Sequence, residues 1–250
     1  MNTKRAIVIG ASSGIGREVC LRLLQDGWTL GIAARRLEPL NEIKESYPQQ
    51  VEVAVIDITK ENAGELLQQL IDRLGGIELY FHASGIGKQN LSLQEEIEMS
   101  TVATNGFGFT KMVGTAYRYM AEHGGGSIGV ISSIAGTKGL GASPAYSATK
   151  AFQNKYIEAL EQQAKLRKLN IHFTDIRPGF VATALLDGGQ GYPLLLRPEN
   201  VAKEIVSSLY KKRHVRVIDW KYRILTPLWR MLPRWLWVRL PIANSKTRNS

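Results

Sequence analysis

The sequence predicts an α/β protein with a large, doubly wound parallel sheet. Short apolar runs rich in β-branched residues alternate with longer segments in which apolar residues recur at every third or fourth position. This alternation is typical of βαβ units, which place their strands parallel in one sheet. Residues 1–218 contain no internal repeat and no linker-like stretch, so we expect a single domain there and a C-terminal extension over residues 219–250.

Seven runs have the length and composition of buried strands, which predicts seven strands with helices on both faces of the sheet. Val19, Leu23 and Leu24 have the spacing of a buried helix face, and the same spacing returns at Leu66, Leu70 and Leu74. The predicted strands cover residues 6–9, 29–33, 51–56, 79–82, 127–132, 171–176 and 215–218.

Composition limits the class of protein. With 250 residues, 44% of them hydrophobic, the chain can bury a core without disulfides or a structural metal. Cys20 is the single cysteine, and the four histidines show no zinc-ligand spacing. We therefore expect no metal site, a reducing compartment and a cytoplasmic location.

The positive charge lies at the C-terminal end. Residues 1–210 contain equal numbers of basic and acidic residues, whereas residues 211–250 contain eleven Lys and Arg against Asp219 alone, which accounts for the net charge of +10. Four of the five tryptophans lie in the same stretch. A neutral body without a nucleic-acid-binding motif argues against RNA or DNA as a partner.

The extension leaves two interpretations open. Thr226 followed by Pro227 predicts the start of an amphipathic helix, which Pro233 should divide. A basic helix with tryptophans suits an anionic membrane surface, with residues 220–240 lying peripherally on the inner face of a membrane. Alternatively, the aromatic residues pack on the protein itself, complete a substrate pocket or form a dimer interface. Arginines and prolines interrupt residues 224–242, so no membrane-spanning helix is expected.

A glycine-rich loop follows the first predicted strand and opens a helix. Glycines at such a turn allow the backbone to approach a pyrophosphate, and the helix N-terminus offers free N–H groups and a positive dipole. The loop therefore predicts a phosphate cradle, although glycines also serve simple turns. Its candidate cofactor contacts are Gly10, Ser12, Ser13, Gly14, Ile15 and Gly16.

The end of the second predicted strand indicates which dinucleotide binds. An acidic residue there would bond the ribose 2′-hydroxyl of NAD, whereas an arginine accommodates the 2′-phosphate of NADP. This chain has Arg35 and Arg36, which favours NADP(H), with Arg35 as the main contact. The alternative is that both are solvated charges before the next helix.

Tyr146 and Lys150 lie four residues apart, which places them on one face of a helix. A free phenol has a pKa near about 10, and an adjacent ammonium favours its ionised form. The pair predicts Tyr146 as a general acid or base.

Together these motifs resemble the short-chain dehydrogenase/reductase family over residues 4–218. The matching pieces are the loop from Gly10 to Gly16, Asp57, Asn105, Ser133, Tyr146 with Lys150, and Pro178-Gly179 with Thr183. The resemblance implies a Rossmann-type fold and hydride transfer between NAD(P)(H) and a carbonyl/alcohol pair. It also implies a small-molecule substrate and a homodimer or homotetramer.

The resemblance assigns roles to the catalytic residues. It makes Tyr146 the general acid in reduction, and has Lys150 lower the pKa of Tyr146 and hold the nicotinamide ribose. Ser133, preferred over Ser132, would bond the substrate oxygen. Asn105 would hold a water that links Lys150 to solvent.

The resemblance likewise implies the remaining cofactor contacts. Asp57 and Ile58 would bind the adenine, although Asp57 alone could also be a helix cap. Further contacts would come from Ser84, Gly85, Tyr146, Lys150, Pro178, Gly179, Val181 and Thr183.

Two positions depart from the family pattern. Ile9 stands where the family usually has Thr, and residues 82–85 read His-Ala-Ser-Gly where the family usually has Asn-Asn-Ala-Gly. We interpret His82 as a structural hydrogen bonder. Leucines and glycines over residues 184–197 predict a small apolar flap over the substrate.

These observations predict an NADP(H)-dependent reductase acting on an apolar ketone or aldehyde, or on the matching secondary alcohol. The alternative is a non-catalytic NADP-binding protein whose basic extension recruits a membrane or a protein partner.

Overall fold

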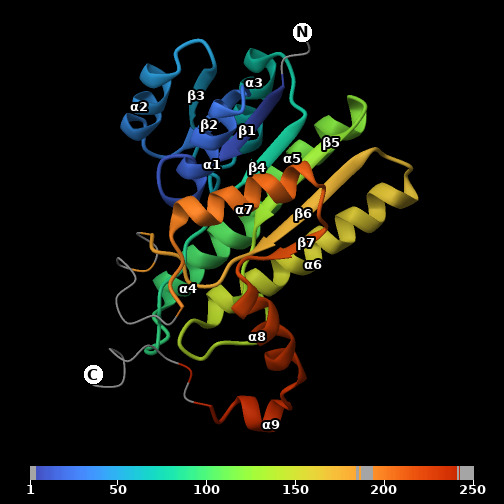
Figure 1. Cartoon of the computed structure of the whole chain (residues 1–250). Coiled ribbons are helices and arrows are strands. Elements are labelled where there is room, and N and C mark those ends of the chain that lie inside the picture. The colour runs from blue at the N-terminus through green and yellow to red at the C-terminus, as the bar shows by residue number, and fades with distance from the viewer. Residues whose placement is uncertain (1–3, 184–185, 187–193, 241, 243–250) are drawn as a thin grey trace.

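The computed structural model describes residues 4–183, 186, 194–240 and 242. Its centre is one seven-stranded sheet in the order β3-β2-β1-β4-β5-β6-β7, with every strand parallel to its neighbours (Figure 1). The strands are β1 (Arg5–Ile9), β2 (Thr29–Ala34), β3 (Val51–Val55), β4 (Leu79–His82), β5 (Gly126–Ile131), β6 (Ile171–Arg177) and β7 (Val215–Val217). Each end lies within one residue of its prediction, so the predicted fold class is confirmed.

Helices cover both faces of the sheet, and a separate apolar core lies under each layer. On one face pack α3 (Ala63–Leu74), α5 (Phe109–Glu122) and α6 (Pro144–Leu166). On the other face pack α1 (Gly14–Gln25), α2 (Glu38–Ser46) and α7 (Pro198–Tyr210). A helix α4 (Glu95–Val102) runs through a π-helical segment η1 (Ala103–Gly108) into α5. The strand order reverses between β1 and β4, which in such sheets creates a crevice at the carboxyl ends of the strands.

Past β7, the chain forms α8 (Trp220–Met231) and α9 (Arg234–Trp237), which project beyond the sheet (Figure 1). The predicted start of this helix at Thr226 is wrong. Asp219 caps α8 seven residues before Thr226, accepting a 2.8 Å hydrogen bond from the N–H of Lys221, and the helix continues through Pro227. Pro233 separates α8 from α9, as the sequence predicts. The division of the chain at residue 218 stays a prediction.

Among the described residues, no helix is both long enough and apolar enough to cross a membrane.

Candidate active site

Three of the predicted catalytic side chains meet at the carboxyl end of β5. Ser133 follows this strand in an extended conformation and caps the short 3-10 helix η2 (Ile134–Thr137), where its Oγ accepts a 3.0 Å hydrogen bond from the N–H of Ala135. Tyr146 lies in the first turn of α6, which begins at Pro144 after Ser143. The hydroxyls of Ser133 and Tyr146 are hydrogen-bonded, and Lys150 lies one turn further along α6.

Two opposing effects act on the pKa of Tyr146. Burial raises the pKa of Tyr146, and the hydrogen bond from Ser133 only partly offsets this. The Nζ of Lys150 lies 5.7 Å from the centre of the phenol ring, and its hydrogen bonds go to other groups. The lowering of this pKa by Lys150 stays a prediction.

Lys150 is a buried cation, with 4% of its surface exposed. Its Nζ donates to the carbonyl of Ile131 at 3.0 Å and to Oε1 of Gln153 at 2.9 Å. Burial lowers the pKa of Lys150 to about 8, and the nearby carboxylate of Asp175 acts in the opposite direction. The ammonium thus gives up its proton at a lower pH than an exposed lysine would.

Asn105 lies in η1 and is completely buried. Its side chain holds the loop that follows β4, because Oδ1 accepts from the N–H of Ile86 at 2.9 Å and Nδ2 donates to the carbonyl of Ile86 at 2.7 Å. Nδ2 also lies 3.3 Å from the hydroxyl of Thr149 on α6. The main-chain carbonyl of Asn105 accepts a 2.8 Å hydrogen bond from Nε2 of Gln153, and the water that Asn105 was expected to hold stays a prediction.

Two residues that the sequence analysis missed complete this cluster. Gln153 is fully buried and bridges Lys150 to Asn105. Its sequence signal is a polar residue three positions after Lys150, on the same helix face. Gly87 lies directly against Tyr146, because a Cβ at this position would come within 2.5 Å of the phenol ring. Nothing in the sequence around Gly87 indicates this contact.

Ser132 makes contacts that differ from those of its neighbour Ser133. It is buried, and its hydroxyl donates to Asp175 on β6. Arg177 pairs with the second oxygen of the same carboxylate, with Nε to Oδ2 at 2.7 Å. The carboxylate of Asp175 is also close enough to raise the pKa of Lys150, against the larger effect of burial.

His82 ends β4 inside the core and has no exposed surface. Its Nδ1 lies 2.8 Å from the hydroxyl of Tyr80, and its ring packs edge-on against Phe109. Burial and the charge of Lys150 lower the pKa of His82 to about 3, so the imidazole is neutral at ordinary pH. These contacts support the structural interpretation of His82.

The glycine-rich loop is shaped as a cradle at the N-terminus of α1. Gly10 has φ of +89°, and a Cβ there would come within 2.7 Å of the backbone nitrogen of Ser84. A Cβ on Gly16 would lie 2.2 Å from the carbonyl oxygen of Gly10. Both glycines are thus required by the close packing of the loop on its own backbone, and the first turn of α1 contains no acidic residue that would repel an anion at the helix N-terminus. This geometry fits the pyrophosphate of a dinucleotide. Ser12, Ser13, Gly14 and Ile15 form the rest of the loop.

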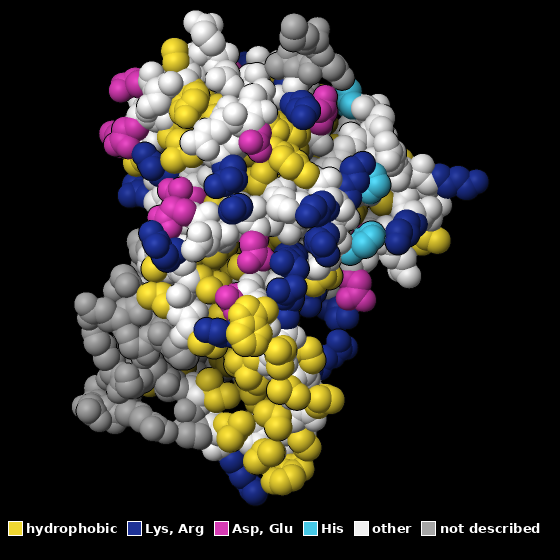
Figure 2. Space-filling model, viewed as in Figure 1, with side chains coloured by type: hydrophobic (Ala, Val, Ile, Leu, Met, Phe, Trp, Pro, Cys, Tyr) yellow, Lys and Arg dark blue, Asp and Glu magenta, His cyan; other side chains and the backbone are white. Residues whose placement is uncertain are grey.

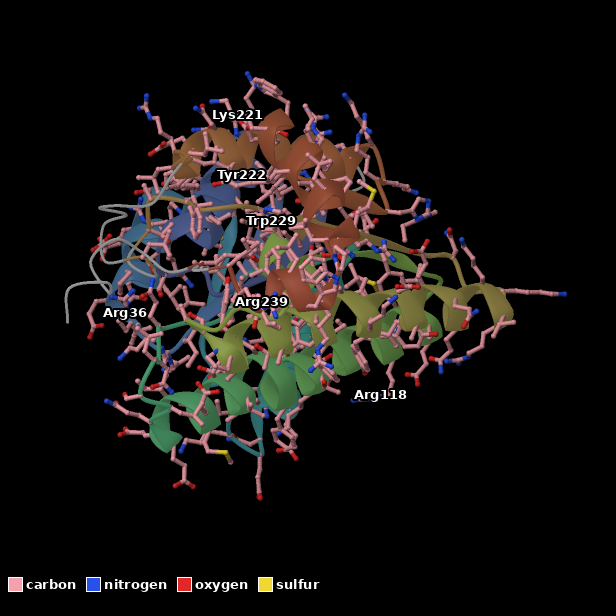
Figure 3. All side chains as sticks on the ribbon, turned by 90° about the horizontal axis from the view of Figure 1, so that it is seen from below. Arg36, Arg118, Lys221, Tyr222, Trp229 and Arg239 are labelled. Atoms are coloured by element: carbon pink, nitrogen blue, oxygen red, sulfur yellow. The ribbon has the colours of Figure 1, made fainter. Side chains whose placement is uncertain are left out.

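Arg35 and Arg36 are exposed after β2, before α2 begins at Glu38. Arg36 reaches back to the loop, with Nη2 to the hydroxyl of Ser12 at 3.3 Å, whereas Arg35 acts electrostatically on Asp57. Figure 3 shows Arg36 at the margin of the molecule. Both side chains are exposed and lie near the glycine-rich loop or the turn at Asp57.

Asp57 follows β3 and forms a turn rather than a helix cap, because α3 begins only at Ala63. Its Oδ1 accepts from the N–H of Thr59 at 3.0 Å and from the hydroxyl of Thr59 at 2.7 Å. Burial acts to raise the pKa of Asp57, but these two hydrogen bonds and the charge of Arg35 outweigh it and lower the pKa. Ile58 is buried against Gly108.

The segment after β6 lies opposite the loop. A Cβ on Gly14 would lie 3.2 Å from the methyl group of Thr183, so the two predicted cofactor contacts are neighbours. The carbonyl of Pro178 accepts a 3.2 Å hydrogen bond from the N–H of Ile134. Val181 is buried and forms an isolated β-bridge with Leu196. Ser84 and Gly85 border the same crevice, Gly85 next to Asn105 and Lys150. Of the predicted flap over residues 184–197, residues 184–185 and 187–193 lie outside the described residues.

Tyr222 of α8 was also missed. A Cβ on Gly179 would come within 2.1 Å of its ring, and its hydroxyl donates to the carbonyl of Leu194 at 3.2 Å. The N–H of Phe180 lies 3.4 Å from the same hydroxyl. The extension therefore supports the segment that carries Pro178 and Gly179, as one of the packing alternatives predicts.

Comparison with known proteins agrees with this arrangement. A family model described as short chain dehydrogenase matches residues 4–189. The chain belongs to this family. It is 28% identical over 218 residues to an uncharacterized oxidoreductase of Staphylococcus epidermidis, covering 86% of this chain and 94% of that protein. It is 29% identical over 240 residues to an uncharacterized oxidoreductase of Myxococcus xanthus, covering 93% and 94%.

Solved structures share the fold at lower identity. A short-chain dehydrogenase from Streptomyces avermitilis has a TM-score of 0.80 at 23% identity, covering 95% of this chain and 98% of that one. An actinorhodin polyketide ketoreductase variant with NADPH has a TM-score of 0.74 at 23% identity, covering 83% and 90%. An alcohol dehydrogenase from the archaeon Thermococcus sibiricus, complexed with 5-hydroxy-NADP, has a TM-score of 0.76 at 22% identity, covering 87% and 96%. The chain is thus an oxidoreductase of the short-chain dehydrogenase family.

Proposed function

We propose that this oxidoreductase reduces an apolar ketone or aldehyde with NADPH, and that Tyr146 is the general acid. The observation that carries the proposal is the hydrogen-bonded pair of Ser133 and Tyr146 beside a buried lysine, next to a glycine cradle at a helix N-terminus. A nicotinamide dinucleotide held there supplies the hydride.

The chain's own residues perform the proton chemistry. Ser133 and Tyr146 direct their hydroxyls to one point, where both hydrogen-bond a substrate carbonyl oxygen and stabilise the negative charge that develops on it. Because burial raises the pKa of Tyr146, its phenol is protonated at neutral pH and ready to donate to that oxygen. Lys150, one helical turn away, stabilises the phenolate that remains after the transfer.

The preference for NADP rests on Arg35 and Arg36. Both are exposed beside the cradle, no acidic residue stands at the end of β2, and Arg36 already contacts the loop through Ser12. An arginine can bind a 2′-phosphate with two parallel hydrogen bonds, which a 2′-hydroxyl cannot match. The NADP compounds bound by the two similar structures agree with this choice.

Assembly and location complete the proposal. Val102, Phe107 and Phe152 lie on neighbouring helices and are 46%, 60% and 44% exposed, which supports a homodimer or homotetramer through this face. We place the enzyme in the cytoplasm, where a single buried thiol such as Cys20 needs no partner.

The test is consumption of NADPH and NADH by the purified protein with ketones and aldehydes of graded chain length. We expect turnover with NADPH that increases with chain length and falls about 10²- to 10⁴-fold in Tyr146→Phe. The double variant Arg35→Ala/Arg36→Ala should raise the KM for NADPH about tenfold and leave the KM for NADH unchanged. Tight NADPH binding without turnover on any substrate would instead favour the non-catalytic NADP-binding protein.

A further inference from the structure

The outward face of the C-terminal helices is an apolar surface with no covering element among the described residues. Its six large side chains recur at three- and four-residue spacing and are each more than half exposed. Figure 2 shows hydrophobic side chains gathered over the lower part of the molecule, where Figure 1 places α8 and α9. We call this the tail surface: Trp220 (59%), Ile224 (58%), Leu228 (51%), Met231 (71%), Trp235 (62%) and Val238 (67%).

The opposite face of the same helices packs against the rest of the enzyme, so the tail surface faces away from it. Tyr222 and Thr226 are buried, Trp229 is half-buried, and the ring centres of Trp229 and Trp237 lie 6.0 Å apart. The Nε1 of Trp237 donates to the carbonyl of Gly139 at 2.7 Å. Lys138 Nζ donates to the carbonyl of Leu232, at the turn between α8 and α9, at 2.6 Å. The helices thus have two apolar faces, and only one of them is used inside the fold.

Positive charge borders the tail surface. Residues 220–240 contain five basic and no acidic residues. Two of the cations lie over exposed tryptophan rings, Lys221 at 6.0 Å from the centre of Trp220 and Arg239 at 5.8 Å from the centre of Trp235. Tryptophan beside lysine or arginine is the combination that suits the boundary between lipid headgroups and acyl chains.

We propose that the tail surface docks the enzyme on a membrane that contains anionic lipids. The charge pattern favours lipid over a second copy of the chain, since a two-fold contact through this surface would bring the same basic residues together. Anionic headgroups neutralise them, while the apolar side chains enter the acyl boundary. With twelve residues in α8 and four in α9, the helices lie along the interface rather than cross it.

The docked position places the catalytic crevice beside the lipid. Lys138 and Gly139, which hold the tail, follow directly on η2, the helix that Ser133 caps. Tyr222, on the inner side of α8, contacts Gly179 at the crevice. An apolar substrate that leaves the membrane at this surface would meet the site without crossing bulk water.

The experiment is sedimentation of the full-length protein with vesicles of phosphatidylcholine alone and of phosphatidylcholine mixed with phosphatidylserine. We expect binding to the mixed vesicles that weakens as salt is raised. Trp235→Ser and Arg234→Glu should each weaken it by about tenfold. Leu166→Ser, at a 78% exposed leucine on α6, and Lys203→Glu, at an exposed lysine on α7, are the matched controls and should bind as the wild type does.

Two results would overturn this assignment. One is equal sedimentation of wild type and tail variants with the mixed vesicles at low salt. The other is a change of oligomeric state in Trp235→Ser, measured by light scattering, which would make the tail surface an interface between copies of the chain. The readout is independent of turnover, so the proposal stands or falls separately from the reductase activity.

A second inference concerns Gln153 and rests on the proposed function. The Lys150 ammonium has three protons, and two of them are committed to the carbonyl of Ile131 and the Oε1 of Gln153. The amide group of Gln153 donates in turn to the carbonyl of Asn105 at 2.8 Å. A glutamine has no proton to release at these pH values, so this link can orient its neighbours but cannot relay a proton.

We infer that Gln153 is a positioning residue that sets the charge state and orientation of Lys150 behind Tyr146. The side chain is fully buried and has no other hydrogen-bond partner among the described residues. Both the oxygen and the nitrogen of its amide therefore bond to residues of the site. The acceptor Oε1 favours the charged form of Lys150, and the donor Nε2 occupies the Asn105 carbonyl.

The test is the pH profile of kcat/KM for carbonyl reduction. Gln153→Leu removes an acceptor from the ammonium and should move the alkaline limb about one unit lower. Gln153→Glu adds an anion and should move it about one unit higher. Thermal unfolding and NADPH titration of both variants check that the fold and the cofactor site persist.

The outcomes separate the two claims. In one outcome, the wild type is active and both folded Gln153 variants show the same alkaline limb of the kcat/KM pH profile as the wild type. That result overturns the role of Gln153 alone. An inactive wild type, or a fully active Tyr146→Phe, overturns the proposed function itself.

Discussion

Positive charge is buried in the catalytic crevice and exposed on the C-terminal helices. In the crevice Lys150 is 4% exposed and held by two hydrogen bonds, and burial brings its pKa to about 8. Along residues 220–240, five cations border an exposed apolar surface with no acidic residue among them. A buried cation is tuned by its partners, whereas an exposed set acts through its summed field. The following predictions test this contrast, from the largest expected effect to the smallest.

The largest effect is expected at the buried cation. Lys150→Met keeps the length of the side chain but removes the charge that stabilises the phenolate, so kcat/KM for reduction should fall about 10²-fold. In the wild type, activity should decline above about pH 8 as Lys150 loses its proton, because its pKa is lowered and not raised. Steady-state kinetics over a pH series measures both effects.

Lys155→Met is the matched control, since Lys155 is on the same helix with 76% of its side chain exposed. A comparable loss of activity in this variant would show that the effect does not come from burial of the charge.

The inner face of the tail should contribute to stability. Tyr222 is 2% exposed and packs on Gly179, so Tyr222→Ala should lower the free energy of unfolding by about 3 kcal/mol. Chemical denaturation followed by circular dichroism measures this change. A loss below about 1 kcal/mol would mean that α8 is not an integral part of the folded enzyme.

Acid should destabilise the protein through His82. Its folded pKa of about 3 lies below the ordinary value of 6.5, so between these values the unfolded chain binds a proton that the folded chain does not. Stability due to this group is therefore lost as the pH falls from about 6.5 toward 3, with a slope of at most about 1.4 kcal/mol per pH unit. In His82→Gln the slope should be shallower, which denaturation at several pH values would detect. If the free energy of unfolding falls with pH equally steeply in the wild type and in His82→Gln, His82 is not a buried neutral imidazole.

The smallest effect is expected on the tail surface. Met231 is 71% exposed, so Met231→Ser should change the free energy of unfolding by less than about 0.5 kcal/mol while weakening vesicle binding. Denaturation and sedimentation of the same preparation compare the two quantities. A large loss of stability would place Met231 in a packed interface.

Much of the fold was predictable because its signals are local. The seven strands follow from apolar runs, and the Tyr146–Lys150 pair follows from helical spacing within α6. The start of α8 was mispredicted because Thr226-Pro227 resembles a helix start, while Asp219 supplies a real cap before it and the exposed side of the helix tolerates Pro227. The partners of the Lys150 ammonium could not be predicted either, because Nζ donates to the carbonyl of Ile131 and to Oε1 of Gln153, which lie on other parts of the fold or one turn further along α6.

By itself, the sequence determined the parallel sheet, the position of the glycine loop and the residue types available for proton transfer, since each depends on spacing within one or two neighbouring elements. Only the tertiary structure decided which groups surround Lys150, which glycine lies against Tyr146, and which face of α8 is buried. Those contacts join residues of different elements, such as Asn105 with Gln153 and Gly179 with Tyr222, and no local pattern encodes them.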